Sequence, residues 1–273
     1  MLKLFGIEFK NPIFLASGTY GYGYEFPQVV KEMGALFTKG ITRFPKQGNE
    51  PPRIFETPAG LINRVGLENI GIDRFINEVL PKIRSLTKIF VNIAGSAIDD
   101  YCFLAERLDG LVDGIELNVS CPNVRNGLVF GRDPKLLYQL TQAVRKRTTL
   151  PIIVKLTPNF CDLIETARAA VNAGADGVSL INTLAAGFFY HGRFYTGGLS
   201  GPAIKHFALY CVHLVREAIT PPIIGIGGIT SGKDVVDFLN AGADAVAIGS
   251  INLKDPEAGI RILAEYNRLR GEL

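Results

Sequence analysis

Short apolar runs recur along the chain, separated by longer segments in which apolar residues follow helical spacing. The runs are rich in Val and Ile and do not alternate with polar residues, which is typical of parallel strands buried on both faces. Eight runs occur, at 12–18, 35–40, 88–95, 114–120, 151–156, 177–182, 222–228 and 245–250. Helices are predicted at 24–34, 72–86, 99–111, 133–148, 162–174, 204–219, 231–242 and 255–269.

Eight strand-plus-helix units in 273 residues predict an α/β fold of one domain, a single (β/α)8 TIM barrel spanning residues 1–273. A doubly wound open sheet is the alternative, but it usually has fewer strands and an early nucleotide-binding turn. Asp133-Pro134 and Asp255-Pro256 resemble an N-cap followed by a first-turn proline, and Gly174 and Gly242 fit helix ends. Two longer stretches, about 41–71 and 187–198, follow strands and are expected as insertions at the C-terminal face.

Composition narrows the class of protein without adding a site. The chain is 47% hydrophobic and 20% charged, with a formal net charge of +3 and dispersed Lys and Arg, which does not favour nucleic acid. We find no signal peptide and no apolar run long enough to span a membrane. Four cysteines lack paired spacing and no residues have metal-ligand spacing, so we expect a cytoplasmic protein with reduced thiols and no metal.

Polar residues and glycines fall at the C-terminal ends of the predicted strands, which converge on one mouth in a barrel. The polar residues are Ser17, Lys39, Asn92, Asn118, Lys155, Asn182 and Thr183; the last two strands end in Gly227, Gly228, Gly249 and Ser250. The glycines predict a phosphate cradle, supported by the start of the following helix. Glycines that serve only tight turns between strand and helix are the less favoured alternative. A dinucleotide fingerprint at 225–234 fails, because Thr230 replaces the last glycine.

Two lysines and one cysteine define the candidate chemistry. Lys39 and Lys155 need anionic or carbonyl partners, because a buried ammonium is costly, or one of them forms a Schiff base. Cys121 follows the fourth strand in a loop with Gly127 and Gly131, where a lid thiol would act as nucleophile or base. Cys102, Cys161 and Cys211 are predicted to be structural. Flavin redox chemistry, a Schiff-base phosphosugar lyase and a silent scaffold are the classes left open.

Nine segments in family order carry a resemblance over almost the whole chain. The chain resembles the class 1 dihydroorotate dehydrogenases, soluble FMN enzymes of pyrimidine biosynthesis, and is most similar to the NAD-linked type. Among these segments are "NPIFLASGTYGYG", "RIFETPAGLIN", "ELNVSCPN", "VKLTPN", "GGLSGPAIK" and "IIGIGGI". The resemblance implies a homodimer core, in a heterotetramer with two subunits that each carry FAD and a 2Fe–2S cluster. This chain itself has no cysteines spaced for a cluster.

The resemblance also implies a role for each site residue. Cys121 would remove the C5 proton of dihydroorotate while a hydride passes from C6 to N5 of FMN, with Lys39 and Lys155 beside the reacting rings. The implied substrate positions are Lys39, Asn63, Arg64, Val65, Gly66, Leu67, Asn118, Asn123, Asn182 and Thr183. The implied flavin positions are Ser17, Lys39, Gly40, Asn92, Asn118, Lys155, Ile181, Gly201, Gly227, Gly228, Gly249 and Ser250.

One loop departs from the family pattern. Arg64, Val65 and Glu68 stand where a small residue, Ile or Met, and Gln are expected, so two charged residues are placed beside the ring pocket. Arg64 favours a substrate with a carboxylate over dihydrouracil. A related flavin barrel acting on another dihydropyrimidine shares the cysteine after the fourth strand and is the nearest alternative. A tRNA dihydrouridine synthase would need a further helical domain and a basic surface.

Overall fold

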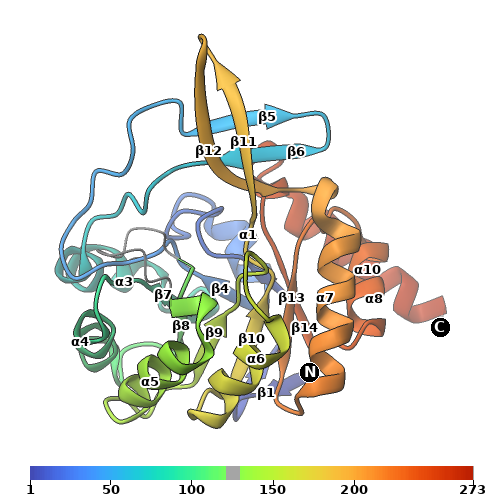
Figure 1. Cartoon of the computed structure of the whole chain (residues 1–273). Helices are drawn as coiled ribbons and strands as arrows, with labels where there is room; N and C mark the ends of the chain where they lie inside the picture. Colours follow the sequence, from blue (N-terminus) through green and yellow to red (C-terminus); the bar gives the residue numbers. More distant parts are fainter. Residues whose placement is uncertain (121–129, 273) are drawn as a thin grey trace.

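In the computed structural model, which describes residues 1–120 and 130–272, eight parallel strands close into a barrel (Figure 1). Its strands, in chain order, are β3 (Ile13–Leu15), β4 (Ala35–Phe37), β7 (Lys88–Ile93), β8 (Gly114–Asn118), β9 (Ile152–Lys155), β10 (Gly177–Leu180), β13 (Ile223–Ile226) and β14 (Ala245–Ile248). Each lies within one predicted apolar run, and consecutive strands pair, with β14 returning to β3. The predicted TIM barrel is confirmed.

The helices follow the predicted segments and surround the barrel. They are α1 (Pro27–Glu32), α2 (Ile72–Arg74), a π-helical turn η1 (Phe75–Val79), α3 (Leu80–Ile83), α4 (Ile98–Leu108), α5 (Pro134–Arg145), α6 (Leu163–Asn172), α7 (Lys205–Ala218), α8 (Gly232–Asn240), α9 (Ile251–Lys254) and α10 (Ala258–Glu272). Short 3-10 turns lie at η2 (Phe130–Arg132) and η3 (Pro202–Ile204). Within these described ranges, no helix is both long and apolar enough to cross a membrane.

Helix ends mostly obey the predicted signals. Asp133 caps α5 by accepting from Lys135 N at 2.8 Å, and Gly174 and Gly242 have φ of +99° and +107° just beyond α6 and α8. Asp255 differs: its carboxylate accepts from Glu257 N, and the regular helix begins only at Ala258. The prediction of Asp255 as the N-cap of α10 is therefore wrong by a few residues.

Aromatic side chains fill the N-terminal half of the barrel interior. Phe37 stacks on Phe90 with ring centroids 5.1 Å apart, and Phe14 lies 5.0 Å from Phe9. Phe9 comes from an unpredicted hairpin of β1 (Leu2–Leu4) and β2 (Ile7–Phe9), at the opposite end of the barrel from the inserted strands (Figure 1). Because this end is packed with apolar groups, polar strand residues can gather only toward the other end.

The two insertions form one antiparallel sheet above the barrel mouth (Figure 1). It contains β5 (Ile54–Thr57) and β6 (Gly60–Asn63) from the first insertion, and β11 (Leu184–Tyr190) and β12 (Arg193–Ser200) from the second. Strand β12 pairs with β6, and Phe188 stacks on Phe55 at 4.3 Å. The position of the insertions was predicted, whereas their joint sheet was not.

Candidate active site

Lys155 is a buried cation at the C-terminal end of β9. The residue is 5% exposed, and its Nζ donates to Ser17 Oγ at 3.0 Å across the mouth. Among residues 1–120 and 130–272, no carboxylate forms an ion pair with it. A buried ammonium whose hydrogen-bond partner is a neutral hydroxyl is costly unless an anionic or carbonyl group completes its surroundings. Ser17 and Lys155, predicted as neighbours of a flavin, are thus brought together in a place that suits an electron-rich ring edge.

A chain of amides crosses the neighbouring strand ends. Asn118 Nδ2 donates to Asn92 Oδ1 at 3.4 Å, and Asn92 Nδ2 donates to Glu116 Oε2 at 2.6 Å. Glu116 is 1% exposed and also accepts from Ser179 Oγ at 2.7 Å. Since Glu116 takes the amide nitrogen, the oxygen of Asn92 is directed to the side where a Cβ on Gly40 would lie 2.9 Å away.

Glu116 was missed by sequence reasoning. It lies two residues before Asn118 on β8 and therefore on the same strand face, and this period-two relation could have identified it. The carboxylate fixes which end of the Asn92 amide points toward Gly40 and Asn118. Glu116 therefore orients the side chain of Asn92, a predicted site residue.

Arg64 and Glu68, the two charged residues of the 63–69 loop, bind different partners. Glu68 forms an ion pair with Lys39. Arg64 instead donates through Nη1 to Glu50 O at 2.8 Å and lies over the Tyr195 ring. The predicted pair of charges beside the ring pocket is therefore divided between a strand-end lysine and the inserted sheet.

The backbone of this loop also holds predicted positions. Val65 O accepts from Asn49 N at 2.9 Å, while Gly66 and Leu67 have φ of +76° and +57°. A Cβ on Gly40 would lie 3.5 Å from Leu67 Cδ2, so Leu67 reaches the Asn92 side of the mouth.

The inserted sheet meets the mouth at Gly198. Asn63 Nδ2 donates to Gly198 O at 3.2 Å, and a Cβ on Gly198 would lie 2.0 Å from Thr183 Oγ1. Asn182 Oδ1 accepts from Thr183 N at 2.8 Å. Asn159, which was not predicted, donates to Thr183 O at 2.7 Å and joins this loop to the one after β9. Three predicted substrate positions from distant segments are thereby gathered.

Glycines line the other side of the mouth. Gly201, Gly227 and Gly228 have φ of +99°, +138° and +69°. A Cβ on Gly228 would lie 2.7 Å from Gly201 O, and a Cβ on Gly201 would lie 3.5 Å from Ser250 Oγ. These loops are in contact, and added side chains would fill the space between them. Gly249 is more open, since the nearest atom to an added Cβ is 3.7 Å away.

One more predicted flavin position, Ile181, lies between the side-chain and glycine groups of the mouth. Ile181 is buried, and its N–H donates to Ile226 O at 3.0 Å, which joins the end of β10 to the end of β13. Backbone N–H groups beside glycines are the usual phosphate ligands of this fold. Gly201, predicted as another flavin contact, lies in space between Gly228 and Ser250 of the predicted cradle.

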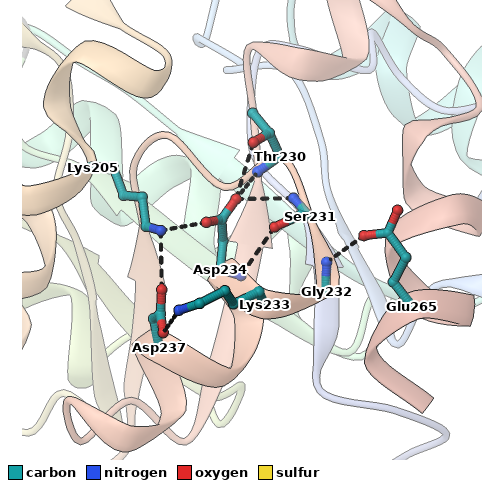
Figure 2. A network of polar contacts seen from close by, with 8 residues as sticks. All are labelled: Lys205, Thr230, Ser231, Gly232, Lys233, Asp234, Asp237 and Glu265. Atoms are coloured by element: carbon teal, nitrogen blue, oxygen red, sulfur yellow. Dashed lines mark hydrogen bonds and ion pairs between the residues drawn. The ribbon is translucent and has the colours of Figure 1, made fainter. Parts of the chain in front are cut away.

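The N–H groups at the start of α8 are already bonded within the protein. Asp234 Oδ2 accepts from Thr230 N at 2.8 Å and Ser231 N at 2.9 Å, and Glu265 Oε2 accepts from Gly232 N at 2.8 Å (Figure 2). These donors are already bound to protein carboxylates, so a phosphate would have to use the glycine segment instead. The predicted support from this helix start is a favourable dipole, which does not require these N–H groups to bind the phosphate directly.

The described cysteines, Cys102, Cys161 and Cys211, are buried or half-buried free thiols. Burial raises the pKa of Cys211 to about 11 and also raises the pKa values of Cys102 and Cys161. Cys161 Sγ donates to Thr157 O at 3.0 Å. Cys121 and Asn123, with Gly127, lie outside the described residues.

The chain is similar to known proteins of one family over nearly its full length. A sequence model of the family described as "Dihydroorotate dehydrogenase" matches residues 1–269. The chain is 48% identical over 279 residues to a Geobacter metallireducens protein, covering 98% of this chain and 92% of the relative. It is 47% identical over 273 residues to an Alkaliphilus metalliredigens protein, covering 96% and 90%. Both relatives are named dihydroorotate dehydrogenase B (NAD(+)), catalytic subunit.

Proposed function

The chain belongs to the dihydroorotate dehydrogenase family, and from that premise we propose that it oxidises (S)-dihydroorotate to orotate with FMN, in pyrimidine biosynthesis. The observation that carries the flavin assignment is Lys155, a buried ammonium paired within the described chain only with the Ser17 hydroxyl. A flavin presents an electron-rich N1–C2=O edge that satisfies such a cation. The contacting glycine loops at 201, 228 and 250 suit the phosphate of the same cofactor.

The residues around Lys155 fall into two sets, one expected to bind the flavin ring and the other the dihydropyrimidine ring of the substrate. Asn92, with its oxygen turned toward Gly40, and Asn118 would bind ring N–H and C=O groups of the flavin. Asn63, Asn182 and Thr183, gathered at Gly198, would bind the dihydropyrimidine from the side of the inserted sheet. Asn118 and Lys39 would contact both. Asn123 would complete the substrate set.

Lys39 suits the carboxylate of dihydroorotate only in part. It shares its charge with Glu68, and the Lys39 side chain is 23% exposed. The Arg64 guanidinium is engaged by the carbonyls of Glu50 and Pro52, so substrate binding by Arg64 requires it to exchange those bonds. Val65 and the left-handed residues Gly66 and Leu67 would then contact the substrate through the loop backbone.

The chemistry is a paired loss of a proton and a hydride that creates the C5=C6 double bond. FMN, when bound, supplies the acceptor for the hydride leaving C6. Cys121 acts as the base that takes the C5 proton; the reference pKa of a cysteine thiol, about 8.5, is not far from working pH. Lys155 holds a fixed positive charge where negative charge accumulates during the transfer.

We further propose that electrons leave through a partner subunit to NAD+. The relatives are named NAD(+)-linked catalytic subunits, which supports a complex in which another chain completes the reaction. By family resemblance that chain carries FAD and a 2Fe–2S cluster and joins a homodimer of this one. NAD+ reduction by dihydroorotate that requires the added subunit would support this; equal NAD+ reduction by this chain alone would contradict it.

The assignment is tested by anaerobic reduction of the bound flavin. We expect a yellow protein that releases FMN on denaturation and bleaches with dihydroorotate but not with dihydrouracil. A colourless protein that cannot be reconstituted with FMN contradicts the flavin assignment. Borohydride trapping of a substrate on a lysine would instead support the lyase.

The role of Cys121 has its own test. Cys121→Ala should bleach roughly 10²- to 10⁴-fold more slowly, the usual contribution of a general base, while still binding orotate. Cys161→Ala is the matched control, because that thiol is bonded to a backbone carbonyl and should leave the rate unchanged. Unchanged bleaching by Cys121→Ala would exclude it as the base.

A further inference from the structure

A compact cluster of charges joins the starts of α7 and α8 (Figure 2). Lys205, the first residue of α7, forms ion pairs with Asp234 and, at 3.0 Å, with Asp237; Lys233 pairs with Asp237 at 2.9 Å. The Asp234 and Lys205 side chains are only 9% and 17% exposed. Two lysines and two aspartates sum to zero charge. The Lys205 ammonium is therefore already neutralised and is not a free anion ligand.

The cluster adjoins the glycine loops on both sides. Lys205 follows Gly201 by one 3-10 turn, and a Cβ on Gly228 would lie 2.9 Å from Lys205 Cβ. Asp234 binds the next part of the same loop, accepting from Thr230 N, Thr230 Oγ1 at 3.0 Å and Ser231 N. Lys205 thus links the Gly201 segment to the carboxylate that shapes the segment after Gly228.

We propose that Lys205 and Asp234 are a positioning pair that holds the 227–232 loop against Gly201 in the shape that binds the FMN phosphate. The pair does not touch the phosphate. The inference rests on the proposed function for the identity of the ligand. Its physical basis is that backbone N–H groups bind an anion well only if their directions are set before binding, so that little ordering is paid for on association.

Loss of either partner has a defined consequence. Without Lys205, Asp234 is a buried carboxylate without its cation, close to the loop that must receive an anion, so repulsion adds to disorder. Without the Asp234 carboxylate, Thr230 and Ser231 lose a charge-assisted acceptor and the loop is released. Removing both charges avoids the repulsion but not the loss of order.

The test compares FMN with riboflavin, which lacks the phosphate, as probes of apoprotein binding by flavin fluorescence quenching. The variants are Lys205→Met, Asp234→Asn, their double variant and Lys205→Arg. The matched control is Asp244→Asn. Asp244 pairs with Arg216 at 3.1 Å and accepts Ile223 N at 2.8 Å, so it is a similar ion pair at the other end of α7.

We expect Kd for FMN to rise on the order of tenfold in Lys205→Met and Asp234→Asn, as for loss of one charge-assisted hydrogen bond. Kd for riboflavin should stay within about twofold, and the double variant should be weakened less than the product of the two single effects. Lys205→Arg should retain most FMN affinity, and Asp244→Asn should leave both Kd values unchanged.

The outcomes are separable. Equal weakening of FMN and riboflavin, or a similar FMN loss in Asp244→Asn, would show a general structural role and overturn the proposal. Unchanged FMN affinity in both single variants would also overturn it. Failure of the wild-type apoprotein to bind FMN would instead contradict the proposed function itself.

Discussion

The two sides of the barrel mouth differ in what they present. Strands β3, β4, β7, β8 and β9 lead to polar side chains, including Ser17, Lys39, Asn92, Asn118 and Lys155. Strands β13 and β14 end in glycines and Ser250, with Gly201 joining them after β12. Side chains can distinguish one ring edge from another, whereas exposed backbone can surround a phosphate closely.

The two sides are also stabilised differently. On the side-chain half, site residues orient each other or are oriented from within the barrel, as Glu116 orients Asn92. Glycines have no side chain with which to do this. The half of the mouth built from the loops at Gly201, Gly228 and Ser250, the glycine half, therefore depends on the adjoining Asp234 and Lys205. A site assembled from backbone therefore needs charged support residues that do not themselves meet the ligand. Three predictions test this contrast, from the largest expected effect to the smallest.

Lys155→Met should impair the function of the side-chain half, the part of the mouth formed by polar strand-end side chains. Flavin reduction by dihydroorotate should slow on the order of 10²- to 10³-fold, because a preorganised charge is lost where negative charge accumulates. FMN should remain bound through the glycine half. Stopped-flow bleaching measures the rate, and Lys88→Met is the control, since Lys88 pairs with Asp113 at the start of β7. If Lys155→Met bleached at the wild-type rate, the proposal that the side-chain half supports the reaction while the glycine half holds FMN would be contradicted.

Asp234→Asn should expose the dependence of the glycine half on pH. Burial alone would raise the pKa of Asp234, but bonds from Lys205 and Thr230 outweigh it and hold the pKa below 3.8. This stabilisation is complete above the unfolded value and is lost as pH falls through the folded one. The wild-type apoprotein should exceed the variant by about 2–3 kcal/mol in unfolding free energy at pH 7, with the gap shrinking below about pH 4.

Urea unfolding of both apoproteins at neutral and acid pH measures that gap. Titration of Lys205 does not contribute to the loss of stability at acid pH. Although burial lowers its pKa, the bonds to Asp234 and Asp237 raise the net value above 10.5, so its contribution is lost only in strong alkali. A gap that is constant from pH 7 to pH 3 would contradict the ion-pair origin of the stabilisation.

Glu116→Gln should test the side-chain half by disturbing only the orientation of the Asn92 amide. A glutamine offers one uncharged oxygen and one N–H2 group in place of the carboxylate, so the bond from Asn92 Nδ2 loses its charge assistance and the Asn92 amide is held less firmly. We expect roughly a tenfold fall in kcat/KM, with a shifted flavin absorbance maximum. Ser179→Ala, which leaves the Asn92 bond in place, should have a smaller effect. An unchanged spectrum and rate would mean that Glu116 does not set the Asn92 orientation.

Much of the mouth was predictable because strand ends are local features. Ser17, Lys155, Asn92 and Asn118 were identified from where apolar runs stop, and the structure brings them together as expected. Glu116 was hidden inside a run that reads as fully buried. Asp234 was hidden because its acidic side chain lies inside a segment that already fits an amphipathic helix.

Sequence by itself determined the eight strands, the enclosing helices and the residues at each strand end. It could do so because these depend on backbone periodicity and on neighbouring residues. Only the tertiary structure decided that Glu68 pairs with Lys39, that β6 joins β12, and that Gly232 N at the start of α8 donates to Glu265. Those choices depend on where loops from distant parts of the chain arrive, and burial then makes each polar group take the partner within reach.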